Sequence, residues 1–169
     1  IGTGLWSVVS GPSTSSAQFS STSAYNATFI PSGGAGTYTL RWTMSNSPCA
    51  SSTDDVVLNF TAAPSAANAG SDQTSSATCG LTTVTLAATA PTTGTGQWSL
   101  VSGSATGTSF SDINSRTSTF SGVAGSSYIL VWTVSNGRCT PSADSVNITF
   151  NASATTASAG ADQSTCGAS

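Results

Sequence analysis

The chain carries an internal repeat, which constrains its fold more than any other feature of the sequence. Trp42 recurs as Trp132 and Cys49 recurs as Cys139, in both cases 90 residues further along. Longer segments return in the same order: 4–11 (GLWSVVSG) as 96–103 (GQWSLVSG), 38–46 (YTLRWTMSN) as 128–136 (YILVWTVSN), 56–60 as 146–150, and 69–73 (AGSDQ) as 159–163 (AGADQ). Self-similarity at a fixed period indicates a tandem array of one structural unit.

The repeat divides the sequence into one complete unit and parts of two others. Residues 64–152 form a complete repeat, residues 1–63 are the C-terminal part of the repeat before it, and residues 153–169 are the linker and first strand of a third. The first part has no counterpart of residues 64–92, so we expect it to leave an apolar face and a sheet edge open. Because the chain opens in mid-pattern, we interpret it as an internal piece of a longer protein.

Short segments with period-two alternation of apolar residues predict β-strands throughout the complete repeat. The clearest segments are 82–89, 96–102, 117–121, 127–136 and 144–151. Segments rich in Gly, Pro and Asn separate them, as turns require. Residues 127–136 carry apolar side chains on both faces, including Ile129 and Val131, so we expect a central strand covered on both sides. The simplest arrangement is an all-β sandwich of about seven strands in each repeat.

The order of motifs resembles that of PKD-like repeats. Each repeat opens with Ala-Gly-x-Asp-Gln and a Cys, and continues with Gly-x-Trp-Ser, then Tyr-x-Leu-x-Trp-Thr-x-Ser-Asn, then a second Cys and Asp-x-Val. The resemblance implies tandem immunoglobulin-like sandwiches from large secreted surface proteins and adhesins of Bacteroidota, of the gliding-adhesin kind exported by the type IX route. The acidic loops common in PKD domains are sparse here, which weakens the case for a calcium site.

The composition excludes most catalytic chemistry. The sequence has no His, Lys or Glu, and charged residues make up 5% of the chain. General acid–base and nucleophilic sites need such groups with placed partners, so we expect neither an enzyme nor a cofactor. Three scattered Arg in a chain of net charge -3 form no basic patch, so we expect no binding to nucleic acid. No apolar run is long enough to span a bilayer, so we expect no membrane insertion.

The large aromatic side chains have two interpretations, a buried core or a platform for stacking sugars. Each recurs in the next repeat beside Leu or Val at an inward position of the alternation, and large aromatics dominate small sandwich cores. We therefore predict that they fill the core; they are Trp6, Trp42, Trp98, Trp132, Tyr38, Tyr128, Phe60 and Phe150.

Polar residues at three positions are candidate sites. Asp72 and Asp162 follow the linkers between repeats and are weak candidates for calcium ligands, because calcium takes six to eight oxygens and each junction offers only one or two carboxylates. The simpler interpretation is an Asp that stabilises a turn through the backbone. Ser145, in the triplet Asp-Ser-Val, resembles the short O-glycosylation signal of Bacteroidota.

Four cysteines in a chain of extracellular character predict disulfides, at Cys49, Cys79, Cys139 and Cys166. Two pairings are open. If residues 103–126 supply one strand, Cys79 and Cys139 lie at the same end of the sandwich and bond within the repeat. If they supply two strands, the two cysteines lie at opposite ends, and Cys79 faces the equivalent of Cys139 in the following repeat.

The sequence therefore predicts a structural or adhesive repeat module of a long extracellular filament, secreted or at the cell surface. Its expected partners are neighbouring repeats or further copies in a filament, and surface glycans. The alternative is a carbohydrate-binding or spacer module of a secreted multidomain hydrolase. Exposed aromatic side chains in the loops would favour the carbohydrate-binding module.

Overall fold

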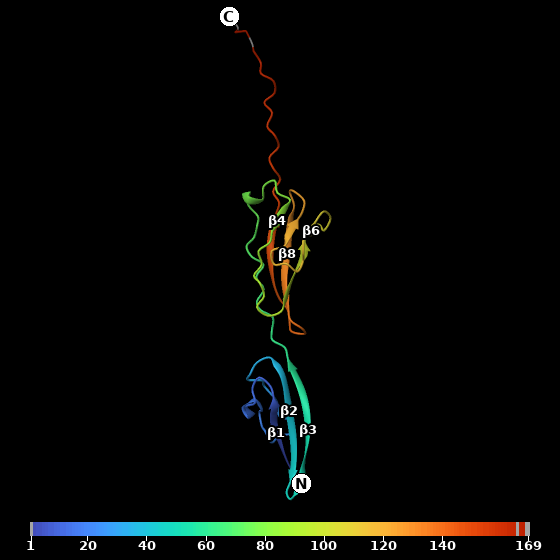
Figure 1. Cartoon of the computed structure of the whole chain (residues 1–169). Coiled ribbons are helices and arrows are strands. Elements are labelled where there is room, and N and C mark those ends of the chain that lie inside the picture. The colour runs from blue at the N-terminus through green and yellow to red at the C-terminus, as the bar shows by residue number, and fades with distance from the viewer. Residues whose placement is uncertain (1, 165, 168–169) are drawn as a thin grey trace.

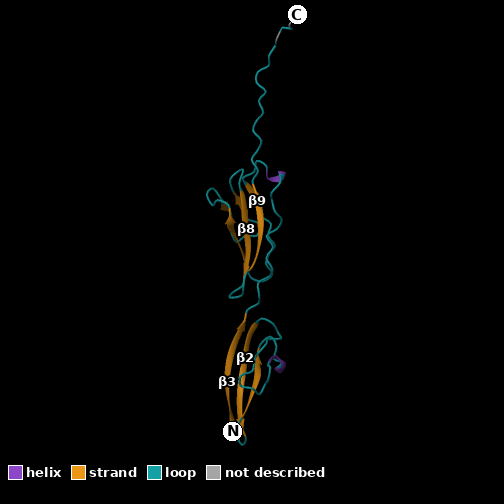
Figure 2. Cartoon of the chain, turned by 180° about the vertical axis from the view of Figure 1, so that it is seen from behind, coloured by secondary structure: helices purple, strands orange, loops and turns teal. Residues whose placement is uncertain are grey.

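The chain folds into two β-sheet bodies placed end to end, followed by an extended segment (Figure 1). The computed structural model describes residues 2–164 and 166–167. The described helices are two 3-10 turns, η1 (Ser16–Gln18) and η2 (Ser76–Thr78), and every other element is a strand (Figure 2). Neither turn is long or apolar enough to cross a membrane. The prediction of an all-β chain is confirmed.

The first body, residues 3–60, is built around one antiparallel sheet in the order β1-β2-β3. The strands are β1 (Thr3–Ser10), β2 (Gly36–Asn46) and β3 (Cys49–Phe60). A loop containing η1 covers one face of this sheet, where Phe19 stacks on Trp6 with ring centroids 6.0 Å apart.

The second body, residues 65–150, is a sandwich of two antiparallel sheets. One sheet has the order β5-β8-β9, with β5 (Thr95–Ser102), β8 (Ser127–Ser135) and β9 (Ser142–Thr149). The other has the order β4-β7-β6, with β4 (Thr83–Thr85), β6 (Ser109–Phe110) and β7 (Thr119–Ser121). The body thus has six strands against the seven expected. The seventh position is taken by residues 65–73, which make only one ladder contact, a parallel bridge from Gln73 to Ile148.

The repeat in sequence is a repeat in strand register. Trp6 lies opposite Trp42 across β1 and β2, and Trp98 lies opposite Trp132 across β5 and β8. The pairing shifts by one residue at the same place in both bodies, just after Val8 and just after Leu100. Because a one-residue slip moves every side chain to the opposite face, the shared register places the recurring aromatics on the same face of each sheet.

A glycine in each body makes room for a tryptophan ring. Gly96, two residues before Trp98, lies under the indole of Trp132, and a Cβ atom at this position would overlap that ring. Gly4 lies under Trp42 in the same way. The Gly-x-Trp motif thus places one tryptophan and leaves space for its neighbour on the adjacent strand.

The second body has a closed core made entirely of its own side chains. Trp98, Trp132, Tyr128 and Phe150 are all buried there, in one cluster with apolar residues from both sheets and from the segment through Ala69. Phe120 on β7 joins the two sheets through its ring contact to Tyr128 on β8 at 5.2 Å, and it contacts Phe110 on β6 of its own sheet at 5.0 Å. Because no residue of the first body contributes to this cluster, the second body has what it needs to fold as a unit.

The first body is only partly covered. Tyr38 is buried, whereas Trp6, Trp42 and Phe60 are half-buried although their counterparts in the second body are buried. Val56 is 41% exposed, whereas its counterpart Val146 is 1% exposed. The described first body contains no counterpart of residues 64–92, which in the second body cover this face. These three aromatics are therefore half-buried at the edge of the first body's core, where part of the apolar face is open.

The expectation that β8 is covered on both faces is wrong. The strand is central in its sheet, but Ile129 on its outer face is 38% exposed. The sheet β4-β7-β6 and residues 65–73 pack against the inner face alone. The apolar side chains on the outer face are therefore surface residues.

Candidate functional site at the junction between repeats

The linker after β3 contacts the lower end of the second body, which is the end nearer to the first body. The contact is made at the turn between β8 and β9. The Asn136 side chain donates a hydrogen bond from Nδ2 to the carbonyl of Ala62 at 2.9 Å. The Cys139 thiol lies 3.4 Å from the same carbonyl and 3.5 Å from that of Thr61. Figure 1 shows the linker passing from one body to the other along the long direction of the molecule. The junction is thus fixed by side chains of the β8–β9 turn.

Residues 65–73 run along β9, and acceptor side chains of that strand hold them in place. The backbone N–H of Ala67 donates to Ser142 Oγ at 2.9 Å, and that of Ala69 donates to Asp144 Oδ2 at 2.8 Å. Further along, Gln73 N–H donates to the Asn147 carbonyl at 2.8 Å, and Thr149 N–H donates to the Gln73 carbonyl at 2.9 Å. Side-chain acceptors replace part of a strand ladder here, which explains why this stretch is not a regular strand.

Asp72 adds two further hydrogen bonds between residues 65–73 and β9, and in both its side chain is the acceptor. Its Oδ1 accepts the backbone N–H of Asn147 at 2.8 Å and its Oδ2 accepts the Asn147 side-chain amide at 2.9 Å. The hydrogen bond from the Asn147 backbone, followed by the one from its side chain, holds the pKa of Asp72 below its ordinary value. Both carboxylate oxygens of Asp72 therefore attach residues 65–73 to β9.

The two calcium candidates lie in different surroundings. Asp72 is engaged with Asn147, whereas Asp162 is an exposed residue of the extended segment after β9. Among residues 2–164 and 166–167, no three Asp, Cys or other ligand side chains lie close enough together to hold a metal ion. A calcium role for either residue stays a prediction.

The adjacent carboxylates Asp54 and Asp55 do not work as a pair. Neighbouring residues of a strand point to opposite faces of the sheet. The Asp55 carboxylate accepts two hydrogen bonds from Arg41, at 2.7 and 2.8 Å. These bonds lower the pKa of Asp55 and raise that of Arg41. This surface ion pair contributes little to stability, because both side chains remain partly in water.

Ser145, the candidate O-glycosylation residue, is exposed on β9. It borders a shallow hollow that is also lined by Val131, Ala143 and Asp144. Its hydroxyl is therefore accessible from solvent, and its modification stays a prediction.

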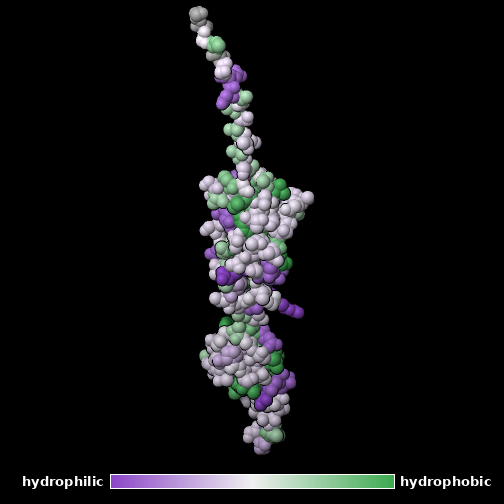
Figure 3. Space-filling view, turned by 45° about the horizontal axis from the view of Figure 1, so that its top comes forward, coloured by the Kyte–Doolittle hydropathy of each residue, from purple (hydrophilic) through white to green (hydrophobic). Residues whose placement is uncertain are grey.

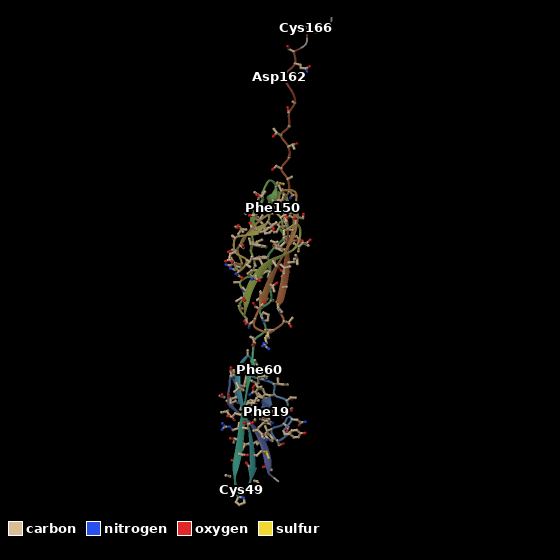
Figure 4. The ribbon with its side chains drawn as sticks, turned by 90° about the vertical axis from the view of Figure 1, so that its right-hand side faces the viewer. Phe19, Cys49, Phe60, Phe150, Asp162 and Cys166 are labelled. Carbon is tan, nitrogen blue, oxygen red and sulfur yellow. The ribbon has the colours of Figure 1, made fainter. Side chains whose placement is uncertain are left out.

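The four cysteines are free thiols in the structure, and three of them are exposed. Cys49 opens β3 at the lower end of the first body, and Cys166 lies on the extended segment far from it (Figure 4). Cys79 directly follows η2, and Cys139 lies in the turn between β8 and β9. None of the four pairs with another within this chain.

One exposed aromatic side chain is not predicted by the repeat pattern. Tyr25, in the loop between η1 and β2, is 82% exposed, and Ile30 further along the loop is 73% exposed. The counterpart of Tyr25 in the second body is not aromatic, so the repeat pattern gave no signal for it. Phe19 and Phe110 pack against other rings instead, Phe19 5.1 Å from Phe29 and Phe110, in β6, 5.0 Å from Phe120.

Neither a family model nor a curated protein matches the sequence. Among solved structures, the chain is similar to the solution structure of the PKD domain from KIAA 1837 protein, with a TM-score of 0.45 and 23% identity. The match covers 54% of this chain and 91% of that chain. A likeness at this level assigns neither a family nor a function to the chain.

Proposed function

We propose that the chain is a non-catalytic structural module of a tandem-repeat extracellular protein, in which successive sandwiches form a stalk or filament. The observation that carries this proposal is the end-to-end arrangement of two bodies with the same strand register (Figure 1). In each body the recurring aromatics lie on the same face of the sheet, fully buried in the second body and half-buried or buried in the first. The large aromatic side chains therefore serve to hold each repeat together.

The surface supports the same proposal. The face seen in Figure 3 consists mostly of residues of intermediate hydropathy, with few strongly hydrophilic patches. With 5% charged residues, the surface carries little electrostatic repulsion between neighbouring copies. Such a surface suits lateral or end-to-end association with further copies, as in a filament. The resemblance to adhesin repeats of Bacteroidota supports an adhesive role and a location outside the cell.

The native parent protein provides the test of this proposal. Electron microscopy of the purified parent should show a long thread whose thickness is that of one sandwich. A parent that is compact, or one that carries these repeats only as a short arm beside a catalytic domain, would contradict the stalk and favour the spacer of a secreted hydrolase.

A second candidate function, glycan binding, is favoured by the exposed ring of Tyr25. A tyrosine face in a loop is a surface on which a sugar can stack. Glycan-array binding of the chain, lost in Tyr25→Ala and kept in Ile30→Ala, would support this function. Ile30 is the matched control because it is a large, exposed apolar residue of the same loop without an aromatic ring. If the chain acts only as a stalk, neither the unchanged chain nor the Ile30→Ala variant should bind a glycan.

A further inference from the structure

We propose that a disulfide bond joins consecutive repeats, between Cys79 of one repeat and the counterpart of Cys139 in the repeat that follows. The inference rests on the proposed function, because it requires complete repeats in tandem. It follows from where the fold places the two cysteines, first within one repeat and then at the junction.

Within one repeat the two cysteines lie at opposite ends of the sandwich. Residues 103–126 supply two strands, β6 and β7, so the chain direction places the loop before β4 and the β8–β9 turn at opposite ends. Cys79 precedes Gly80, whose N–H donates to the carbonyl of Asn151 beyond the end of β9, whereas Cys139 precedes the start of β9. Figure 2 shows η2, which directly precedes Cys79, at the end from which the extended segment leaves.

The separation between these ends rules out a bond inside the repeat. Strand β9 has eight residues, so its ends are on the order of 20 Å apart at about 3.3 Å per residue. The Cα atoms of a disulfide lie within about 7 Å of one another. The pairing of Cys79 with Cys139 in the same repeat would require the sandwich to be taken apart.

At the junction, the two cysteine positions converge on the same backbone segment. Thr61 and Asn151 are counterparts, because they directly follow Phe60 and Phe150. The Cys139 thiol lies 3.5 Å from the Thr61 carbonyl, and the N–H of Gly80 lies 2.9 Å from the Asn151 carbonyl. In a complete junction, one carbonyl therefore has Cys79 beside it from the preceding repeat and the counterpart of Cys139 from the following one.

Other atoms at the two junctions agree with this placement. A Cβ atom on Gly137 would lie 3.3 Å from the side chain of Thr61, and the atoms nearest to a Cβ atom on Gly80 belong to Ser153. The turn that carries Cys139 thus packs against the start of the linker, and the turn that carries Cys79 packs against the same linker one repeat later. Each repeat presents one thiol at its upper end and one at its lower end.

The bond forms by thiol–disulfide exchange with an oxidising disulfide, such as oxidised glutathione or the disulfide of an oxidoreductase. The two cysteine thiols lose two protons and two electrons as the sulfur–sulfur bond forms. The oxidant takes them up, and its own disulfide becomes two thiols. Cys79 is exposed and Cys139 is partly exposed, so both are accessible to such an oxidant.

The test uses a tandem polypeptide in which residues 1–152 are followed directly by a second copy of residues 63–152, in a Cys49→Ser background. The second body has a closed core of its own, so the added copy brings every residue of that core. After oxidation in a glutathione buffer and alkylation of free thiols, trypsin cleaves after the arginines, including Arg138. Mass spectrometry should then find Cys79 of the first copy bonded to Cys139 of the second.

Two outcomes would overturn the proposal. One is that both thiols are alkylated although circular dichroism shows folded β-structure, and the other is a bond between Cys79 and Cys139 of one copy. In the control variant, Cys79→Ser in the first copy alone, Cys139 of the second copy should become alkylated. This readout does not depend on what the stalk binds or on how long it is. A failure of the disulfide and a failure of the stalk would therefore be distinguished.

Discussion

At the residue scale, the Gly-x-Trp motif shows how two positions cooperate. Gly96 carries no side chain, so the indole of Trp132 can lie across β5 beside that of Trp98, with ring centroids 5.1 Å apart. Interiors are close-packed, so an added methyl group has no free volume to occupy here. The alternation in the sequence predicts that the tryptophans are core residues. The need for glycine at position 96 depends on Trp132, which lies on the neighbouring strand.

Gly96→Ala should destabilise the second body by about 1–3 kcal/mol, the usual cost of overpacking a core. Chemical denaturation followed by tryptophan fluorescence measures the change. Gly167→Ala is the control, because a Cβ atom at that position meets nothing within 4 Å. Equal stability of Gly96→Ala and the parent chain would show that the tryptophan ring moves aside at no cost.

Asp72 is the residue whose protonation should matter for the second body. Its pKa is lowered in the folded state by the two hydrogen bonds from Asn147. A carboxyl group with a lowered pKa stabilises the fold at pH values above its unfolded pKa, about 3.9, and this contribution is lost as the pH falls through the folded pKa.

Asp72→Ala should therefore lower the denaturation midpoint at pH 7, and the difference from the parent chain should shrink below about pH 4. Denaturation curves at pH 7 and at pH 2–3 measure both effects, with the pH values taken around the usual aspartate range. Asp162→Ala, on the extended segment, should leave the midpoint unchanged at both. A constant difference across this pH range would contradict the role assigned to the Asp72 carboxylate.

At the element scale, residues 65–73 decide whether a sheet face is covered. In the second body they lie along β9 and Val146 is buried, whereas the first body has no such segment and Val56 is exposed. Along β9 the segment is held by the side chains of Ser142, Asp144 and Asp72 and by the two backbone hydrogen bonds of Gln73, and on its other side by backbone hydrogen bonds to Thr89 and Thr93. Since each end of the segment is held by few of these bonds, a single substitution should detach one end.

Gln73→Pro should release the end of this segment, because proline removes the N–H that donates to Asn147. Hydrogen–deuterium exchange should then become faster at the Thr149 amide, which donates to the Gln73 carbonyl, while the amides of β5 keep their protection. Gln73→Ala keeps the backbone N–H and is the matched control. Unchanged exchange at Thr149 in Gln73→Pro would mean that other contacts hold the segment.

At the scale of the whole molecule, the end-to-end arrangement makes the chain long for its mass (Figure 1). A compact domain of 169 residues has a radius of gyration of about 15 Å. Small-angle scattering should give a clearly larger value, and a chain ending at residue 152 should show a shorter maximum dimension. A radius close to that of a compact domain would mean that the two bodies fold back on one another.

The sequence by itself determined the repeat, the all-β class and the positions of most strands, because alternation and periodicity are local properties of the chain. It also identified Trp98, Trp132, Tyr128 and Phe150 as interior residues, since each recurs at an inward position. It pointed to about seven strands, where the structure has six and a segment held mainly by side chains. The number of ladder contacts along such a segment depends on its partner strand, which local patterns do not encode.

Only the tertiary structure decided which ends of the sandwich the cysteines occupy, how far the first body is covered, and what Asp72 binds. Each of these depends on chain direction and on contacts between residues about 75 positions apart, such as Asp72 with Asn147. Residues 103–126 form two strands, and that places Cys79 at the opposite end from Cys139. A pattern along the chain specifies which side chains turn inward, whereas the meeting of distant segments is fixed by how the strands pack together.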